Sequence, residues 1–269
     1  MGAILGAPFM LATLAFFLVG IAVIVGFIRK KRKFELRVEL RSMRRDLVFF
    51  IIMFGAAISV PHFVRGGREF MAAGLIMGYL IYAYLTFKGD SEVIVHSEEL
   101  YFGKLLGLIR RSTDDNVPTY DGGILLAGFQ VLFAIALMVG GAHVFVSGLE
   151  TLSRAWGVSP LLFSLLVAPI ATELPEKFNS VSWTIKGRDA LAVGNITGAM
   201  VFQSTFPVSL GLLFTDWAIS GLALLSAAFA LASAVVLLMD ISVRKKLSPL
   251  TVILGGVFYL FYAISIMRS

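Results

Sequence analysis

Long apolar segments are the feature of this sequence that most limits how the chain can fold. A membrane-spanning helix needs roughly 20 apolar residues, and 58% of the chain is hydrophobic while only 15% is charged. Because only helices and closed barrels satisfy their backbone within a bilayer, we predict an all-α polytopic membrane protein. The predicted spans number about eight and cover residues 3–28, 47–64, 70–87, 123–146, 158–184, 190–214, 219–239 and 249–267.

The placement of basic residues predicts how these helices are oriented. Of the 23 lysines and arginines, 18 lie in loops that alternate consistently to one side, at residues 29–45, 88–111, 186–188 and 244–246. Because loops rich in basic residues stay in the cytoplasm, we predict a multi-pass protein of the cell's inner or plasma membrane with both termini of this chain outside. The alternative is that one short segment is re-entrant, which would change the side on which one terminus lies.

A charged break interrupts the apolar segment 158–184. Glu173, Glu176 and Lys177 lie beside Pro169 and Pro175, at what is otherwise membrane depth. Charged side chains are costly there and usually face a bundle interior or an aqueous cavity. Prolines free backbone carbonyl groups, which helps only where protein or water can use them. The pattern therefore predicts a broken helix that contributes to a cation site.

Several side chains near this break carry oxygen atoms that could bind a hard cation such as Ca²⁺ or Na⁺. One face of the predicted helix 158–184 holds residues spaced i, i+4, i+7 and i+8, which are Thr172, Glu176, Asn179 and Ser180. Glu173 lies three residues before Glu176 and adds a second carboxylate. The alternative for Glu173 is an ion pair with Lys177, four residues later, which would leave Glu176 without its own counter-charge.

The next predicted helix, 190–214, offers two amide side chains. Asn195, Ala199 and Gln203 form a row at i, i+4 and i+8, so both amides can face the same neighbour. They are candidate ion ligands through their carbonyl oxygens. For Gln203 an interhelical hydrogen bond without an ion is an equally good interpretation.

A short internal repeat links the two halves of the chain. Residues 2–13 align without gaps to residues 194–205, and both copies contain a Gly-xxx-Gly pair, Gly2 with Gly6 and Gly194 with Gly198. Such pairs let helices pack closely. The predicted orientation makes the two helices antiparallel, as an inverted-topology repeat requires. We predict a truncated first repeat of three helices (1–87), a cytoplasmic linker (88–121) and a complete second repeat of five helices (122–269).

Other functional classes find little support in the sequence. Cysteine is absent, which excludes disulfides and cysteine-based metal sites. The sequence contains no HExxH, P-loop or Gly-x-Ser-x-Gly motif, so we predict that the protein is not an enzyme. The net charge of +6 is explained by cytoplasmic loops, and we predict membrane lipid and inorganic cations, but no nucleic acid, as partners.

Two motifs resemble the calcium/cation antiporter superfamily, and specifically the sodium/calcium exchanger membrane domain. Residues 171–176 (ATELPE) are similar to the family's Gly-Thr-Ser-x-Pro-Glu motif, and residues 194–203 (GNITGAMVFQ) to its Gly-Asn-x-x-Gly-Ser helix. The resemblance covers nearly the whole chain. It implies ten helices in two inverted repeats, a cation site at mid-membrane, and exchange of Na⁺ or H⁺ against Ca²⁺ by alternating access. It implies no cofactor other than the transported cation, with Glu176 as the shared carboxylate and Thr172 as an oxygen ligand.

The sequence departs from the family pattern at several points. Glu173 replaces the motif's serine, and Met200 and Pro8 stand at ligand positions of the two repeats, which predicts altered cation selectivity. The helices that would precede Gly2 are absent, so we expect a truncated protein that is inactive in this form. The alternatives are a second chain that supplies the missing half of the repeat, or a non-transporting subunit or degenerate paralogue.

Overall fold

The computed structural model describes residues 2–63, 67–89, 124–157, 168–170, 172–219 and 221–267. The chain divides into two compact units, one made of residues 1–89 and 158–269, the other of residues 90–157. The described part of the second unit is a long helix, α6 (Ile124–Trp156). Most of the predicted linker 88–121, and residues 158–167 of the predicted span 158–184, lie outside the described residues.

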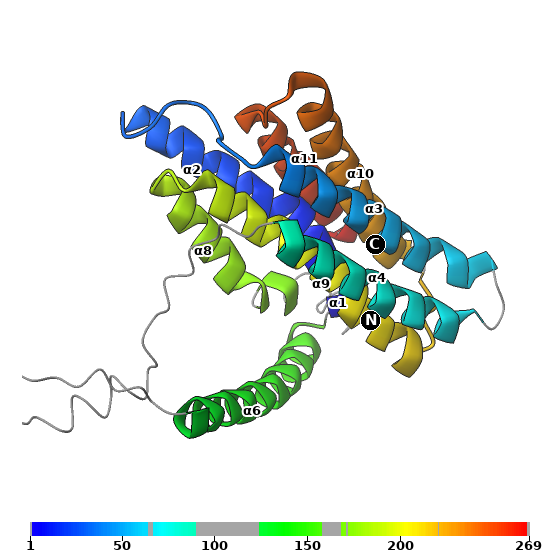
Figure 1. Cartoon of the computed structure of the whole chain (residues 1–269). Coiled ribbons are helices and arrows are strands. Elements are labelled where there is room, and N and C mark those ends of the chain that lie inside the picture. The colour runs from blue at the N-terminus through cyan, green and yellow to red at the C-terminus, as the bar shows by residue number, and fades with distance from the viewer. Residues whose placement is uncertain are drawn as a thin grey trace, which may run out of the picture. The chain divides into compact units, whose positions relative to one another are not determined.

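The first unit is built from helices (Figure 1). Its described residues contain no β-strand, only an isolated bridge between Leu36 and Leu247, so the predicted all-α fold class is confirmed. In chain order its helices are α1 (Gly2–Met10), the π-helical turn η1 (Leu11–Ala15), α2 (Phe16–Ile28), α3 (Leu40–Phe63), α4 (Arg68–Gly89), α8 (Leu174–Ile185), α9 (Asp189–Phe214), α10 (Gly221–Arg244) and α11 (Pro249–Met267).

Six helical segments among the described residues are long and apolar enough to cross a membrane. They are Gly2–Ile28, Arg68–Lys88, Leu126–Trp156, Asp189–Phe214, Gly221–Arg244 and Pro249–Ile266. Each overlaps one of the predicted spans. The two remaining predicted spans, 47–64 and 158–184, fall on α3 and on the segment that ends with α8. The total of about eight membrane spans stays a prediction.

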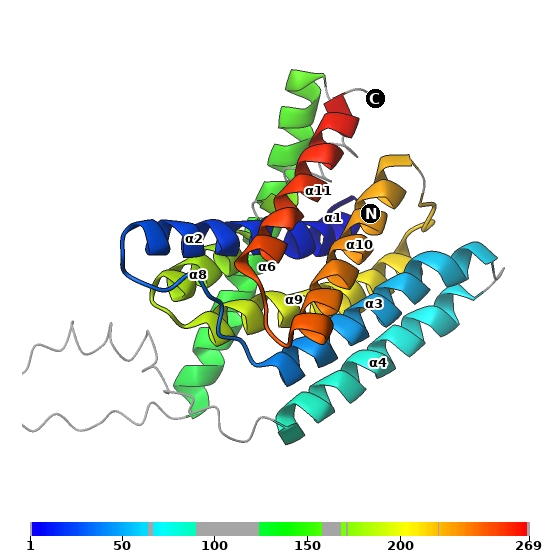
Figure 2. The ribbon, with the colours of Figure 1, turned by 90° about the horizontal axis from the view of Figure 1, so that it is seen from above.

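The helices of the first unit pack in a pattern that looks the same for its two halves. The helix formed by residues 2–28 packs against α10 and α11, and α9 packs against α3 and α4. Helices α3 and α10 also contact each other (Figure 2). Residues 2–28 therefore correspond to α9. In the same way α10 corresponds to α3, and α11 corresponds to α4. An internal repeat of three helices produces that pattern.

The two central helices of this pattern run in opposite directions. Near the end of α9, a Cβ placed on Gly211 would lie 3.1 Å from Ile4, which is close to the start of α1. Just beyond the end of α2, Arg32 binds Asp189, the first residue of α9. The start of one helix therefore meets the end of the other, as the inverted repeat requires.

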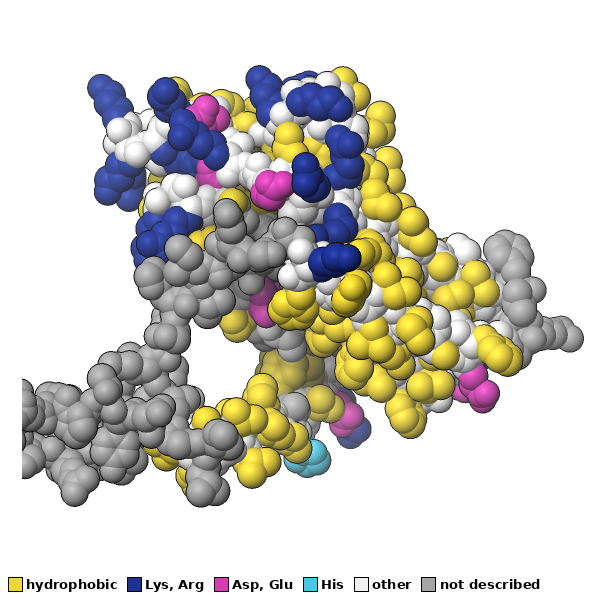
Figure 3. All heavy atoms as spheres, viewed as in Figure 1, with side chains coloured by type: hydrophobic (Ala, Val, Ile, Leu, Met, Phe, Trp, Pro, Cys, Tyr) yellow, Lys and Arg dark blue, Asp and Glu magenta, His cyan; other side chains and the backbone are white. Residues whose placement is uncertain are grey.

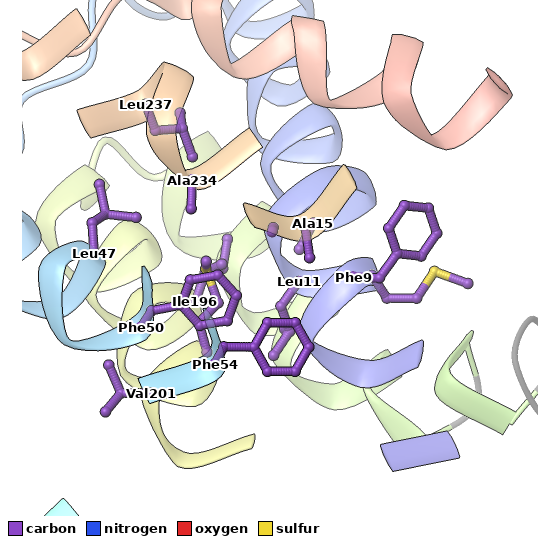
Figure 4. Packing of buried hydrophobic residues seen from close by; sticks show 14 of the residues in the cluster. Phe9, Leu11, Ala15, Leu47, Phe50, Phe54, Ile196, Val201, Ala234 and Leu237 are labelled. Atoms are coloured by element: carbon purple, nitrogen blue, oxygen red, sulfur yellow. The ribbon is translucent and has the colours of Figure 1, made fainter. Parts of the chain in front are cut away.

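The core lies where the helix of residues 2–28 meets α3, α9 and α10 (Figure 4). Aromatic and aliphatic side chains from these helices are almost fully buried there, and α10 contributes small residues, Ala227, Ala230 and Ala234. Lipid is as apolar as such a core, so close van der Waals packing holds membrane helices together. The labelled core residues are Phe9, Leu11, Ala15, Leu47, Phe50, Phe54, Ile196, Val201, Ala234 and Leu237.

Close backbone approach occurs at Gly255, and not at the predicted pair of Gly194 and Gly198. A Cβ on Gly194 would meet nothing within 4 Å, and one on Gly198 would reach only the Tyr82 hydroxyl at 3.9 Å. A Cβ on Gly255 of α11 would instead lie 2.5 Å from the Thr13 carbonyl oxygen. Among the described residues, the predicted role of Gly194 and Gly198 in close helix packing is therefore not seen, while Gly2 and Gly6 are buried in α1.

The first helix has a π-helical turn at Leu11–Ala15, shortly after Pro8. Such a turn displaces backbone carbonyl groups from their usual donors, and the Ser233 hydroxyl of α10 donates to the carbonyl of Ala12 at 2.6 Å. Thr13 and its repeat equivalent, Thr205, each donate to the carbonyl four residues earlier. The aligned segments thus share a local hydrogen bond as well as residue types.

Candidate functional site

The candidate site lies at the start of α8, where the helix is broken between the two prolines named above. Residues 168–170 are helical, Glu173 forms a turn and caps α8, and Pro175 lies in the first turn. Proline fits the first helical turn because the backbone N–H it lacks would have no acceptor there. Across the break, the Glu173 N–H still donates to the Pro169 carbonyl at 3.1 Å.

Glu173 is buried against the middle of α9. Its side chain is 3% exposed, and its Oε1 accepts a hydrogen bond of 2.9 Å from Gln203 Nε2. Its Oε2 is buried and has no hydrogen-bond partner. Because Gln203 lies near the centre of a membrane-length helix, this contact places the Glu173 carboxylate well away from either end of α9.

Glu176 lies in the first turn of α8 and supplies a second incompletely bonded carboxylate. Its Oε2 is also buried without a hydrogen-bond partner. Its backbone carbonyl accepts from Asn195 Nδ2 at 3.2 Å. The two glutamates are three residues apart in the sequence and interact electrostatically.

Asn195 and Ser180 hold α8 against α9. Asn195 Nδ2 also donates to the Ser180 hydroxyl at 3.1 Å, and Ser180 in turn donates to the carbonyl of Ala192 at 3.1 Å. Ser180 is fully buried. The hydrogen bonds of these two predicted ligands therefore join α8 to α9, and this contact positions Glu176.

The predicted row of ligands on one continuous helix differs from the structure. Because α8 begins only at Leu174, Thr172 lies within the break and not in α8 with Asn179. Thr172 and Asn179 are both exposed, whereas Ser180 is buried. The predicted row of four therefore includes both exposed and buried side chains.

Lys177 is buried one turn after Glu173, with 6% of its surface exposed. Its ammonium group donates to the Pro169 carbonyl at 3.1 Å. The ion pairs of the described residues do not include one between Lys177 and Glu173, so the proposed i, i+4 pair is replaced by a bond to the backbone of the break.

Comparisons with known proteins identify the family. The family model described as sodium/calcium exchanger protein matches residues 126–269, more than half of the chain. The chain belongs to this family. The match includes α8, α9 and the whole candidate site.

This exchanger-family chain is also similar to parts of individual proteins. It is 28% identical over 127 residues to CaxA, a candidate antiporter of Alkalimonas amylolytica, and 31% identical over 103 residues to the inner membrane protein YrbG of Escherichia coli strain K12. These segments are 47% and 38% of this chain, but only 38% and 32% of the relatives' own lengths.

A solved structure has the same fold as this family member. The crystal structure of the H⁺/Ca²⁺ exchanger CAX superposes with a TM-score of 0.72 at 18% sequence identity. The likeness covers 100% of this chain and 68% of the other. At that identity it establishes the architecture alone.

Sequence reasoning missed a buried aspartate in this exchanger-family chain. Asp46, at 3% exposure, accepts hydrogen bonds from Thr197 of α9 at 2.6 Å and Tyr82 of α4 at 3.1 Å. It joins three helices at the level of the first turns of α9. In the sequence it follows a run of basic residues and resembles an ordinary loop-edge acid, so only its position beside an apolar segment signalled burial.

A second unpredicted contact fastens the loop that follows α2. Arg32 makes two hydrogen bonds to the Asp189 carboxylate, at 2.9 and 2.8 Å, and also donates to the carbonyls of Thr184 and Glu35. The Arg37 N–H adds a third bond to Asp189 at 3.0 Å. This paired arginine ties the α8–α9 turn to the end of α2.

Proposed function

We propose that the protein is a secondary-active cation antiporter that exchanges Na⁺ or H⁺ against Ca²⁺ or another cation by alternating access. The observation that carries this proposal is the pair of buried carboxylate oxygens, Glu173 Oε2 and Glu176 Oε2, that lack a hydrogen-bond partner. Burying such groups without a partner is costly. A hard cation would satisfy both oxygens at once, and membership of the exchanger family supports the same conclusion.

The other predicted site residues have different parts in this proposal. Gln203 holds one oxygen of Glu173 and so fixes the direction of the other. Asn195 and Ser180 set the contact between α8 and α9. Thr172 and Asn179 are exposed on either side of the first turn of α8, where their oxygens are open to a cation that approaches the glutamates.

The membrane orientation and the repeat organisation belong to the same proposal. Lysine and arginine side chains gather at the end of the first unit where α2 ends and α3 begins (Figure 3). We place that end in the cytoplasm and both termini of the chain outside. In this proposal, residues 1–87 and 122–269 form the two repeats.

Transport in vesicles tests the proposed role of Glu176. We expect proteoliposomes containing the full-length protein to take up ⁴⁵Ca²⁺ when an outward Na⁺ or H⁺ gradient is applied. Glu176→Gln should lower this flux by at least about tenfold, because a contact to a charged group contributes roughly 1.5–3 kcal/mol.

The matched control is Glu69→Gln, which removes an exposed carboxylate at the start of α4. Its flux should equal that of the wild-type protein. If Glu176→Gln transports as fast as the wild-type protein, Glu176 is not a ligand of the transported cation. Absence of flux and of any cation-dependent change in thermal stability would favour a non-transporting membrane subunit instead.

A further inference from the structure

Lys177 places a positive charge inside the candidate site. Its ammonium group is buried and is held by the carbonyl of Pro169, at the helix break itself. Both Glu173 and Glu176 act on it electrostatically. A lysine side chain at such depth is costly and calls for a functional explanation.

The charged groups around Lys177 give the site a net charge of minus one. In their ionised forms, the two carboxylates and the one ammonium group sum to one negative charge. The helices packed against α8 are α2 and α9, and the acidic residue that α9 contributes, Asp189, is held by Arg32 beside the far end of α8. Neither α2 nor the rest of α9 contributes a further charge to balance the site.

A net charge of minus one distinguishes between cations. One monovalent cation brings the site to neutrality, whereas a divalent cation leaves one buried positive charge without compensation. Uncompensated buried charge is strongly unfavourable. Lys177 also occupies the Pro169 carbonyl, one of the oxygens that a helix break would otherwise offer to a cation such as Ca²⁺, which takes six to eight oxygen ligands.

We propose that Lys177 is a specificity-determining residue, a tethered cation that makes this site prefer a monovalent cation such as Na⁺ over a divalent one such as Ca²⁺. The inference rests on the proposed function, because it assigns a preference to the same site. Lys177 acts through its fixed charge and its bond to Pro169, and it is not itself a ligand of the transported ion.

Cation-dependent thermal stability of the purified protein tests this inference. Unfolding midpoints are recorded against NaCl and CaCl₂ at constant ionic strength, balanced with choline chloride, and converted to apparent affinities. We expect Lys177→Met to raise the ratio of Ca²⁺ to Na⁺ affinity by at least about tenfold. The control Lys186→Met, an exposed lysine in the α8–α9 turn, should leave the ratio unchanged.

A charge-restoring variant guards against misfolding of the single variant. Glu173→Gln combined with Lys177→Met removes one charge of each sign and restores a net charge of minus one, so a preference for Na⁺ should return. A Ca²⁺ to Na⁺ ratio within twofold of wild type in Lys177→Met, or a Ca²⁺ preference in the double variant, would overturn the inference alone. If no cation shifts the wild-type midpoint, the proposed function fails, and the inference fails with it.

Discussion

At the scale of single residues, two buried acids differ in what their oxygens contact. Asp46 and Glu173 are equally buried at 3% exposure. Both oxygens of Asp46 accept hydrogen bonds from side chains of other helices, whereas Glu173 leaves Oε2 without a partner. A fully bonded carboxylate fixes helix positions, and an incompletely bonded one leaves ligand capacity. This difference separates the structural acid from the candidate ion ligand.

Replacing Asp46 should therefore lower stability. Asp46→Ala leaves the hydroxyls of Tyr82 and Thr197 buried without their acceptor, and we expect a loss of about 1–3 kcal/mol in the free energy of unfolding. The measurement is denaturant-induced unfolding in detergent. Asp216→Ala, at an exposed position after α9, should change stability by no more than about 0.5 kcal/mol. Equal effects of the two variants would show that the Asp46 contacts contribute little.

At the scale of structural elements, the buried pair of Arg32 and Asp189 joins the end of α2 to the start of α9. Their side chains are only 9% and 3% exposed. Removing either partner should cost about 3–5 kcal/mol, because the other charge stays buried. Combining Arg32→Met with Asp189→Leu should cost much less than the sum, which a double-mutant cycle in detergent measures.

A surface pair in the same loop provides the comparison. Arg37 and Glu35 are 76% and 45% exposed, so their coupling energy should be about 0–1 kcal/mol. Coupling energies of similar size in the two pairs would contradict a special role for Arg32 in fastening the loop.

A second prediction at this scale concerns the close contact between α11 and the first helix. Gly255→Ala would force a Cβ against the Thr13 carbonyl, and such overpacking typically costs about 1–3 kcal/mol. Gly74→Ala in α4 meets nothing within 4 Å and should be neutral or stabilising by up to about 1 kcal/mol, because alanine favours helix over glycine. Thermal unfolding of the two variants compares them directly, and a stable Gly255→Ala protein would show that α11 can move away.

At the scale of the whole molecule, the distribution of charge predicts sidedness. The absence of cysteine allows single cysteines to report it. Lys33→Cys, in the basic loop after α2, should react with a membrane-impermeant maleimide only after cells are permeabilised. Glu69→Cys, at the opposite end of α4 from Tyr82, should react in intact cells. Labelling with the reverse pattern would invert the proposed topology.

Much of the architecture could be predicted from local sequence. Apolar length and charged boundaries placed helices at α1–α2, α4, α9, α10 and α11 within a few residues of their observed bounds, because a helix satisfies its backbone within its own segment. The repeat motif also predicted that the helix of residues 2–28 and α9 run in opposite directions. The break in the span 158–184 was also predicted from its prolines, and α8 does start beside Pro175, at Leu174.

The sequence by itself determined the all-α membrane class, the family motifs and the two glutamates at the helix break, because each depends on residues close together in the chain. Only the tertiary structure decided which polar groups have partners. Thr197 meets Asp46 across 151 positions of sequence, and Gln203 meets one oxygen of Glu173 across 30. Contacts of that kind depend on which helices pack side by side, and no local pattern specifies them.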